Sequence, residues 1–183
     1  MKTKAIPLLF LVMLLLLGIG ALINEGRGVG YNQGYGPTQP IAFSHKIHAG
    51  DNKIACLYCH FAAEKGRHAG IPPVQVCLNC HNEIKPDAPE VKKIHEAVKT
   101  GKTIEWIKVN HYPDFAYFNH SQHVRVANLQ CQECHGPVET MVTLRQEKSL
   151  SMGMCLDCHR KHEIAPPNDH KSKAGGDCAR CHY

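Results

Sequence analysis

Cys56-Leu57-Tyr58-Cys59-His60 is the first of five copies of the pattern Cys-x-x-Cys-His in this chain of 183 residues. In this pattern the two thiols attach covalently to a c-type haem, and the adjacent histidine can bind the iron from one side. Five copies therefore predict five covalent haems c. The predicted attachment residues are Cys56, Cys59, Cys77, Cys80, Cys131, Cys134, Cys155, Cys158, Cys178 and Cys181, and the predicted iron ligands of the motifs are His60, His81, His135, His159 and His182.

Zinc sites and disulfides are the alternative uses of paired cysteines. A structural zinc ion usually takes two Cys-x-x-Cys pairs, and five pairs cannot be divided into such sites without a remainder. A disulfide framework does not need a histidine after every second cysteine. All 10 cysteines of the chain lie in the five motifs. The motifs therefore favour haem over zinc or disulfides.

The composition leaves little material for an ordinary apolar core. The chain has one Trp and five Phe but 15 Gly and 11 Pro, and a domain of this size normally needs a sizeable buried interior. We therefore expect the haems to supply the core and the apoprotein not to fold. The predicted fold is mostly irregular with short α-helices around five covalent haems, plus one N-terminal transmembrane helix.

The net charge does not indicate a nucleic-acid partner. The formal charge of the polypeptide is +5, but each haem adds two propionates and each ferric porphyrin core adds one positive charge. The oxidised, haem-loaded protein would be nearly neutral. We therefore read the lysines and arginines as propionate partners and solvated surface, and expect no nucleic acid to bind.

An apolar segment near the N-terminus predicts a membrane anchor. Ile6 to Ile23 contains no charged residue, and as a helix it would span about 27 Å, close to the hydrocarbon thickness of a bilayer. A cleaved signal peptide is the alternative, although the residues around Ala21 form only a weak cleavage site. Lys2 and Lys4 favour a cytoplasmic N-terminus in the cytoplasmic membrane, with the haem domain in the periplasm.

The expected domain organisation has an anchor over residues 1–24, a flexible Gly/Pro-rich tether over 25–40 and a haem domain over 41–183. The haem domain contains a duplication, since a Phe-x-His-x-x-His pattern and the motif after it recur 75 positions later. Such self-similarity marks a repeated structural unit. It predicts two dihaem modules, 43–81 and 118–159, with a fifth haem in 160–183.

Each electron-carrying haem is expected to have a second axial ligand. The chain has 14 histidines, and the five in the motifs leave nine for this role. The pairs His45/His48 and His120/His123 are the strongest candidates, because side chains three residues apart on a helical turn can serve two haems that lie side by side. The candidates for the fifth iron are His111, His170, His68 and Met141.

The methionine candidate has a distinct consequence. A haem with one histidine and one methionine ligand has a raised potential, whereas packing against porphyrin is the alternative role for Met141, Met152 and Met154. Phe43 and Phe118 are expected to pack on the haems.

Between the modules we expect a helix capped by Asp87 and ended by Gly101. Its apolar face would carry Val91, Ile94, His95 and Val98, so that His95 is packed or hydrogen-bonded rather than a ligand. Residues 103–110 are expected to be extended, and residues 164–176 to be irregular and wrapped around the last haem.

Longer stretches around these residues resemble the membrane-anchored pentahaem cytochrome c subunit of alternative complex III. The Phe-x-His-x-x-His opening is also shared with multihaem modules of the cytochrome c3 and c7 type, which implies a class III-like cytochrome c domain. The stretches that carry the resemblance are Phe43–Gly50, Ala69–Pro73 before the second motif, His111–Val124, Cys134–Met141 and Leu150–Arg160.

The resemblance implies an electron-transfer subunit, not an enzyme by itself, in a respiratory or photosynthetic complex that oxidises quinol. The implied partners within the membrane complex are an iron-sulfur subunit related to molybdopterin oxidoreductases and polytopic quinol-binding subunits. The implied electron acceptor is a periplasmic monohaem cytochrome c or copper protein. The resemblance also suggests His111 as an iron ligand.

Two other functions fit parts of the pattern. A free-standing quinol dehydrogenase that feeds a periplasmic reductase also has one N-terminal anchor, but it needs a haem near the bilayer. A multihaem reductase needs an iron with an open position, and the number of spare histidines argues against one.

Overall fold

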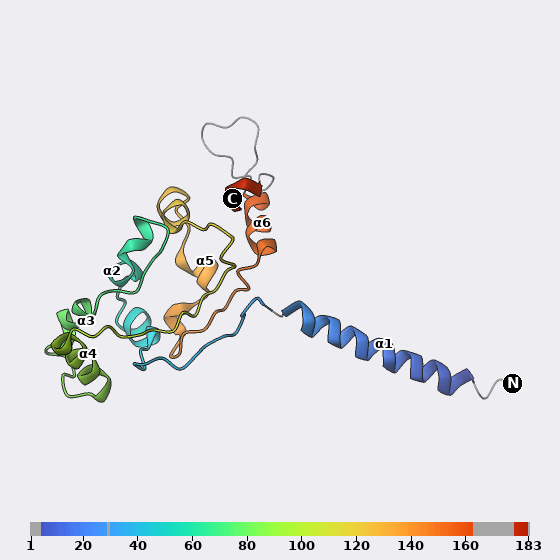
Figure 1. The fold of residues 1–183 in the computed structure, drawn as a ribbon, viewed down its shortest axis with the longest axis horizontal. Helices are drawn as coiled ribbons and strands as arrows, with labels where there is room; N and C mark the ends of the chain where they lie inside the picture. The colour runs from blue at the N-terminus through green and yellow to red at the C-terminus, as the bar shows by residue number, and fades with distance from the viewer. Residues whose placement is uncertain (1–4, 29, 163–177, 183) are drawn as a thin grey trace.

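The computed structural model describes residues 5–28, 30–162 and 178–182. Within these ranges the chain forms helices and turns and contains no strand. Figure 1 shows a rod-like helix, α1, which projects from a separate domain of short helices joined by long loops. The predicted class, short helices in a largely irregular domain after one apolar helix, is confirmed.

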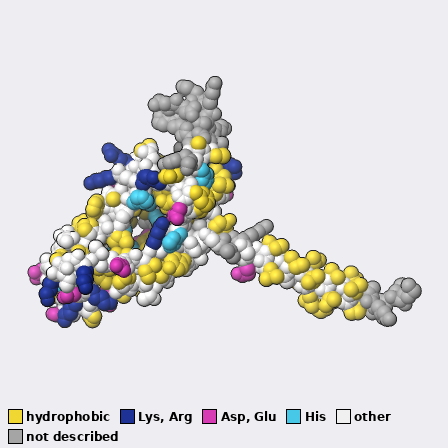
Figure 2. Space-filling model, viewed as in Figure 1, with side chains coloured by type: hydrophobic (Ala, Val, Ile, Leu, Met, Phe, Trp, Pro, Cys, Tyr) yellow, Lys and Arg dark blue, Asp and Glu magenta, His cyan; other side chains and the backbone are white. Residues whose placement is uncertain are grey.

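Helix α1 extends over Ala5–Gly28 and is the one segment in the described part of the chain that is long and apolar enough to cross a membrane. The window Pro7–Gly26 has a mean hydropathy of 2.5, and none of it is buried against the rest of the protein. Figure 2 shows this rod covered with hydrophobic side chains. The helix continues past residue 24, where we expected the anchor to end, because no helix-breaking proline follows.

The segment expected to be a flexible tether is in part bonded to the helical domain. The Gly34 N–H donates to the Gln146 carbonyl (2.7 Å), and the Gln146 N–H donates to the Tyr35 carbonyl (2.8 Å). The side chain of Gln39 makes two hydrogen bonds to the backbone of Ile107. Residues 31–40 therefore lie along the domain instead of hanging free from it, which corrects the expectation of a loose linker.

The helical domain has few buried apolar side chains. Figure 2 shows one face of the domain hollowed in the middle, with histidine side chains around the hollow. A protein of this length normally buries a much larger apolar set, so the prediction of a small side-chain core is confirmed. The buried apolar residues in the described part are Ile41, Ala63, Val91, Ile94, Val109 and Met141.

Helices α3 (Val74–His81) and α4 (Pro89–Thr100) pack against each other at one end of the domain. Val91 and Ile94 are buried as predicted, and Gly101 ends α4 with a φ of 69°, in the left-handed conformation that favours glycine. The predicted cap is wrong: the helix starts one residue after Ala88, with Pro89 in its first turn. The exposed Asp87 instead pairs with Lys92 at 3.5 Å.

The remaining elements are short and belong to the motifs or to the turns before and after them. The segment 103–110 forms neither helix nor strand. The short elements are the π-helical turns η2 (Lys46–Asp51) and η4 (Gln122–Val126), the helices α2 (Cys56–Cys59), α5 (Cys131–His135) and α6 (Met152–Lys161), and the 3-10 turns η3 (Phe61–Glu64), η5 (Val138–Thr140) and η6 (Cys178–Arg180).

Candidate haem sites

Every Cys-x-x-Cys-His motif lies on or directly after a helical turn. In the first motif α2 begins at Cys56, and the His60 N–H donates to the Cys56 carbonyl at 2.8 Å. The fifth motif repeats this bond, from the His182 N–H to the Cys178 carbonyl at 2.9 Å. One helical turn therefore brings both thiols and the histidine of a motif to one side of the backbone, which is the arrangement that attachment to a haem requires.

None of the ten cysteines forms a disulfide. Burial raises the pKa of Cys59, and the nearby thiols of Cys77, Cys56 and Cys80 raise it further. Burial also raises the pKa of Cys134, with Cys158 and Cys155 as neighbours. The first and second motifs therefore lie side by side, and so do the third and fourth.

The thiols do not form a zinc-like cage. Among the described residues, no three His, Cys, Asp or Glu side chains gather as they would around a metal ion. A structural zinc ion needs about four such ligands. A haem iron needs only two ligands from the protein, because the porphyrin supplies the others.

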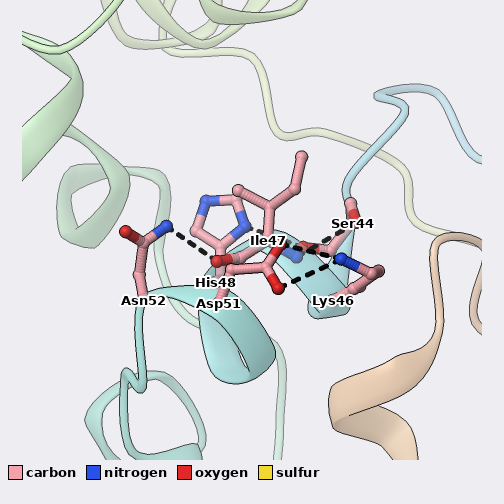
Figure 3. A network of polar contacts seen from close by, with 6 residues as sticks. All are labelled: Ser44, Lys46, Ile47, His48, Asp51 and Asn52. Carbon is pink, nitrogen blue, oxygen red and sulfur yellow. Dashed lines mark hydrogen bonds and ion pairs between the residues drawn. The ribbon is translucent and has the colours of Figure 1, made fainter.

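The first Phe-x-His-x-x-His pattern leads into the π-helical turn η2. The Phe43 ring meets the His45 ring edge-on (centroids 4.9 Å apart, planes at 86°) and stacks on the His48 ring (4.3 Å, 23°). Figure 3 shows the Lys46–Asp51 ion pair (2.9 Å) and the Asn52 amide, which donates to the Ile47 carbonyl (2.7 Å). Contacts between residues of the turn itself thus stabilise the backbone that carries His48.

The second copy has the same geometry. Phe118 meets His120 edge-on (4.8 Å, 89°) and stacks on His123 (4.4 Å, 26°). The positive φ of Lys53 (56°) recurs at the equivalent position, Asn128 (52°). The sequence predicted an ordinary helical turn here, whereas both copies form the rarer π-helical turn, which is common at functional sites.

Backbone carbonyls orient most of these histidine rings. Nδ1 of His48 lies 2.8 Å from the Ser44 carbonyl oxygen, and Nδ1 of His123 lies 2.8 Å from that of Asn119, at the same place in the repeat. A ring whose Nδ1–H donates to a carbonyl keeps the lone pair on Nε2, which is then free to bind a metal. The other Nδ1 contacts are His60 to Gly70 (2.7 Å), His81 to Ile84 (2.9 Å), His120 to Arg67 (2.7 Å) and His182 to Phe115 (3.2 Å).

The structure pairs the histidines of these turns with the histidines of the motifs. Two imidazoles that bind one metal ion from opposite sides, each through a bond of about 2 Å, have ring centroids about 6 Å apart. Three pairs have this separation: His48 and His81 (6.0 Å), His123 and His159 (6.1 Å), and His120 and His135 (6.3 Å, with parallel planes).

His45 and His60 are also neighbours. Burial, followed by the nearby His60 and His48, lowers the pKa of His45 to about 4. The Nδ1 atom of His45 is buried and has no hydrogen-bond partner among the described residues. Burial likewise lowers the pKa of His123 and of His135. The lowered pKa of each ring favours the neutral imidazole, which is the form that binds iron.

The candidates for the fifth iron are spread over the domain. The Nε2 atom of His111 lies 2.8 Å from the Lys108 carbonyl. Met141 is buried after η5, which packs against η2 and lies away from η6 in Figure 1. His68 is exposed, and His170 lies outside the described residues. The His182 ring itself packs against Phe115, with centroids 5.7 Å apart.

His95 occupies the position that its pattern predicted. It lies on α4, and its Nε2 is 3.3 Å from the His81 carbonyl. The prediction of a hydrogen-bonded, partly buried histidine is therefore confirmed. The sequence reasoning missed the carbonyl acceptors of the histidine rings, and among these only Ser44 and Asn119 have a signal in the sequence, their equivalent places in the duplication.

Comparisons with known proteins identify c-type cytochromes as relatives of this chain. Residues 116–183 match the family described as cytochrome c7 and related cytochrome c. The multihaem cytochrome c subunit of menaquinone reductase from Nitratidesulfovibrio vulgaris is 31% identical over 141 residues, which cover 66% of this chain and 67% of that protein. The multihaem cytochrome MtrA of Shewanella baltica is 26% identical over 119 residues, which cover 58% of this chain and 29% of that protein.

Proposed function

The chain belongs to the family of multihaem c-type cytochromes, and from this premise we propose that it carries five haems c as the electron-transfer subunit of a membrane-bound, quinone-linked complex. The observation that carries the proposal is the pairing of motif histidines with turn histidines at ring separations of 6.0–6.3 Å. That spacing suits an iron held on both sides by imidazole.

The haems would supply one-electron redox chemistry at each motif. The cysteines of each motif would hold the porphyrin, and the paired imidazoles would fill both axial positions of the iron. The carbonyls of Ser44 and Asn119 hold the rings of His48 and His123 in one tautomer and one orientation. With both axial positions filled, an iron passes electrons on and does not bind a substrate, which is why we assign a relay and not a catalytic role.

We propose that α1 remains attached and anchors the protein in the cytoplasmic membrane, with the haem domain in the periplasm. The support is its length, its apolar surface and the hydrogen bonds that fix residues 34 and 35 to the domain. A docked segment of this kind would hold the domain close to the bilayer. It would thereby favour contact with membrane subunits, such as an iron-sulfur subunit and polytopic quinone-binding subunits.

The direction of electron flow has two candidates. The resemblance to alternative complex III favours quinol oxidation, with electrons passed to a periplasmic monohaem cytochrome or copper protein. The name of the relative from Nitratidesulfovibrio vulgaris describes a menaquinone reductase, which favours the opposite direction, in which electrons from a periplasmic donor reduce the quinone. We place quinol oxidation first because of the several stretches that carry the resemblance.

The proposal is tested by affinity purification of the tagged chain from membranes of its host. We expect membrane subunits to copurify, haem analysis to return five haems c per chain, and the complex to reduce an added periplasmic acceptor with quinol. If the complex reduces menaquinone with electrons from a reduced periplasmic cytochrome but does not oxidise quinol, the result would select quinone reduction as the direction of electron flow. Rapid quinol oxidation by the isolated chain would contradict the relay role and identify a free-standing quinol dehydrogenase.

A further inference from the structure

The two predicted modules contact each other through a reciprocal pair of hydrogen bonds. The Lys46 N–H, in the first turn, donates to the Met141 carbonyl at 2.9 Å. The Ser121 N–H, in the second turn, donates to the Gly66 carbonyl at 3.1 Å. Because the duplication has an offset of 75 residues, Lys46 is equivalent to Ser121, and Gly66 is equivalent to Met141. Each turn therefore binds the segment that follows the first motif of the other module.

The packing of the short elements follows the same rule. The turn η2 of the first module packs against η5, and the turn η4 of the second module packs against η3. Figure 1 shows η2 beside η5 and η4 near α2 and η3. Suppose that a residue of one unit contacts a residue of the other, and that the same contact recurs with the two units exchanged. The two units are then related by a two-fold axis.

Residues that contact their own equivalents mark the position of such an axis. The Cys131 thiol lies against the thiol of Cys56, which is its equivalent at the offset of 75. His135 likewise has its equivalent, His60, among its neighbours. The first and third motifs therefore meet where the two modules face each other.

We propose that the two dihaem modules pack around an internal two-fold axis, and that this packing places the haem of the first motif directly beside the haem of the third. The inference rests on the five-haem loading proposed above. It gives the chain a central haem pair that belongs to two different modules, although 70 residues (61–130) separate the two motifs in sequence.

The remaining motifs extend this pair in both directions. The Asn79 amide in the second motif donates to the Tyr58 hydroxyl in the first at 2.9 Å. At the other side Cys155 of the fourth motif lies near Cys134, and Cys181 of the fifth lies near Cys155. The haem sites thus follow the order second, first, third, fourth, fifth, with the unpaired fifth site as an extension of the second module.

The test is a double-variant cycle on the reduction potentials of the holoprotein. His45→Met and His120→Met would each raise the potential of one central haem, because a methionine ligand favours the reduced iron. Adjacent haems feel each other's charge, so we expect the two shifts not to add in the double variant. The matched control is the pair His48→Met and His123→Met at the haems of the second and fourth motifs, which are not adjacent in this order and for which we expect the shifts to add.

Additive shifts for His45→Met and His120→Met, or non-additive shifts for the control pair alone, would overturn the proposed order. If a variant loses haem, amide hydrogen exchange in the unmodified holoprotein decides instead: we expect slow exchange at both Lys46 and Ser121, and fast exchange at either amide would contradict the reciprocal packing. Neither measurement involves quinone or a partner subunit. Failure of the proposed quinone-linked role, with the five haems in place, would therefore leave both results unchanged.

Discussion

The ring of Phe43 is stacked on the ring of His48, with centroids 4.3 Å apart and planes at 23°, while its edge contacts His45. Phe118 holds His123 and His120 in the same way. One phenylalanine therefore contacts two imidazoles, which we propose as ligands of two different haems. Aromatic contacts of this geometry contribute about 0.5–1.5 kcal/mol beyond the buried area.

We predict that Phe118→Leu lowers the stability of the holoprotein by about 1–2 kcal/mol, because the ring contacts are lost while most of the apolar volume is kept. The change should also broaden the EPR signals of two ferric haems, since two imidazole planes are no longer fixed. Denaturant titration followed by haem absorption measures the first effect. Phe61→Leu, at an exposed ring near Lys65, is the control and should change neither property.

Gly50 lies where η2 approaches the segment after the third motif. A Cβ atom at this position would overlap the Glu139 carbonyl oxygen, a backbone atom that cannot move without shifting η5. We predict that Gly50→Ala destabilises the holoprotein by about 1–3 kcal/mol through overpacking. Gly66→Ala is the control, because a Cβ atom there meets nothing within 4 Å. Equal thermal stability of the two variants would contradict the close approach of η2 and η5.

The ligand pairing makes a prediction about spin state. His123→Ala removes the ring that faces His159 at 6.1 Å, so one ferric haem of the five should become high-spin and, once reduced, bind carbon monoxide. EPR and carbon monoxide titration measure the stoichiometry. His95→Ala should leave all haems low-spin, because the Nε2 of His95 lies against a backbone carbonyl of the second motif and not in a ligand position. A high-spin haem in that control, or none in His123→Ala, would contradict the pairing.

The features that could be predicted from the sequence are those encoded by local patterns. The duplication predicted that the geometry of Phe43, His45 and His48 recurs at Phe118, His120 and His123, because repeated spacing indicates a repeated unit. The attachment cysteines of the motifs stay a prediction. The buried positions Val91 and Ile94 followed from the helical period. The cap at Asp87 was wrong because Pro89 suits the first helical turn, so that the helix begins just before it.

The features that could not be predicted depend on contacts between distant segments. The π-helical form of η2 and η4, the docking of Gly34 on Gln146 and the reciprocal bonds of Lys46 and Ser121 have no local signal. The tether expectation failed for the same reason, since glycines and prolines indicate a linker only when nothing binds their backbone. The sequence also does not indicate which backbone carbonyl accepts a hydrogen bond from a histidine ring, because every residue has a carbonyl.

Gln146 is the one fully buried large side chain among the described residues. Its amide nitrogen donates to the carbonyls of Tyr31 and Lys148, and its amide oxygen accepts from the His111 N–H at 2.8 Å. We predict that Gln146→Leu costs about 2–4 kcal/mol, because it leaves several buried polar groups unsatisfied. Residues 31–36 should then become sensitive to limited proteolysis. Gln132→Leu, at an exposed glutamine, is the control and should leave the cleavage pattern unchanged.

The small apolar core leads to a prediction for the protein without haem. The six buried apolar side chains of the described part are scattered along the domain, from Ile41 to Met141. Their burial would have to offset the conformational entropy lost when a long, glycine-rich chain is ordered. We predict that the chain produced without haem attachment, with α1 held in detergent, shows helical circular dichroism from α1 alone and rapid amide exchange throughout the rest. The holoprotein in the same detergent is the control and should protect the amides of α3 and α6. A cooperative unfolding transition in the haem-free chain would contradict this prediction, since it would require a polypeptide core that these side chains do not form.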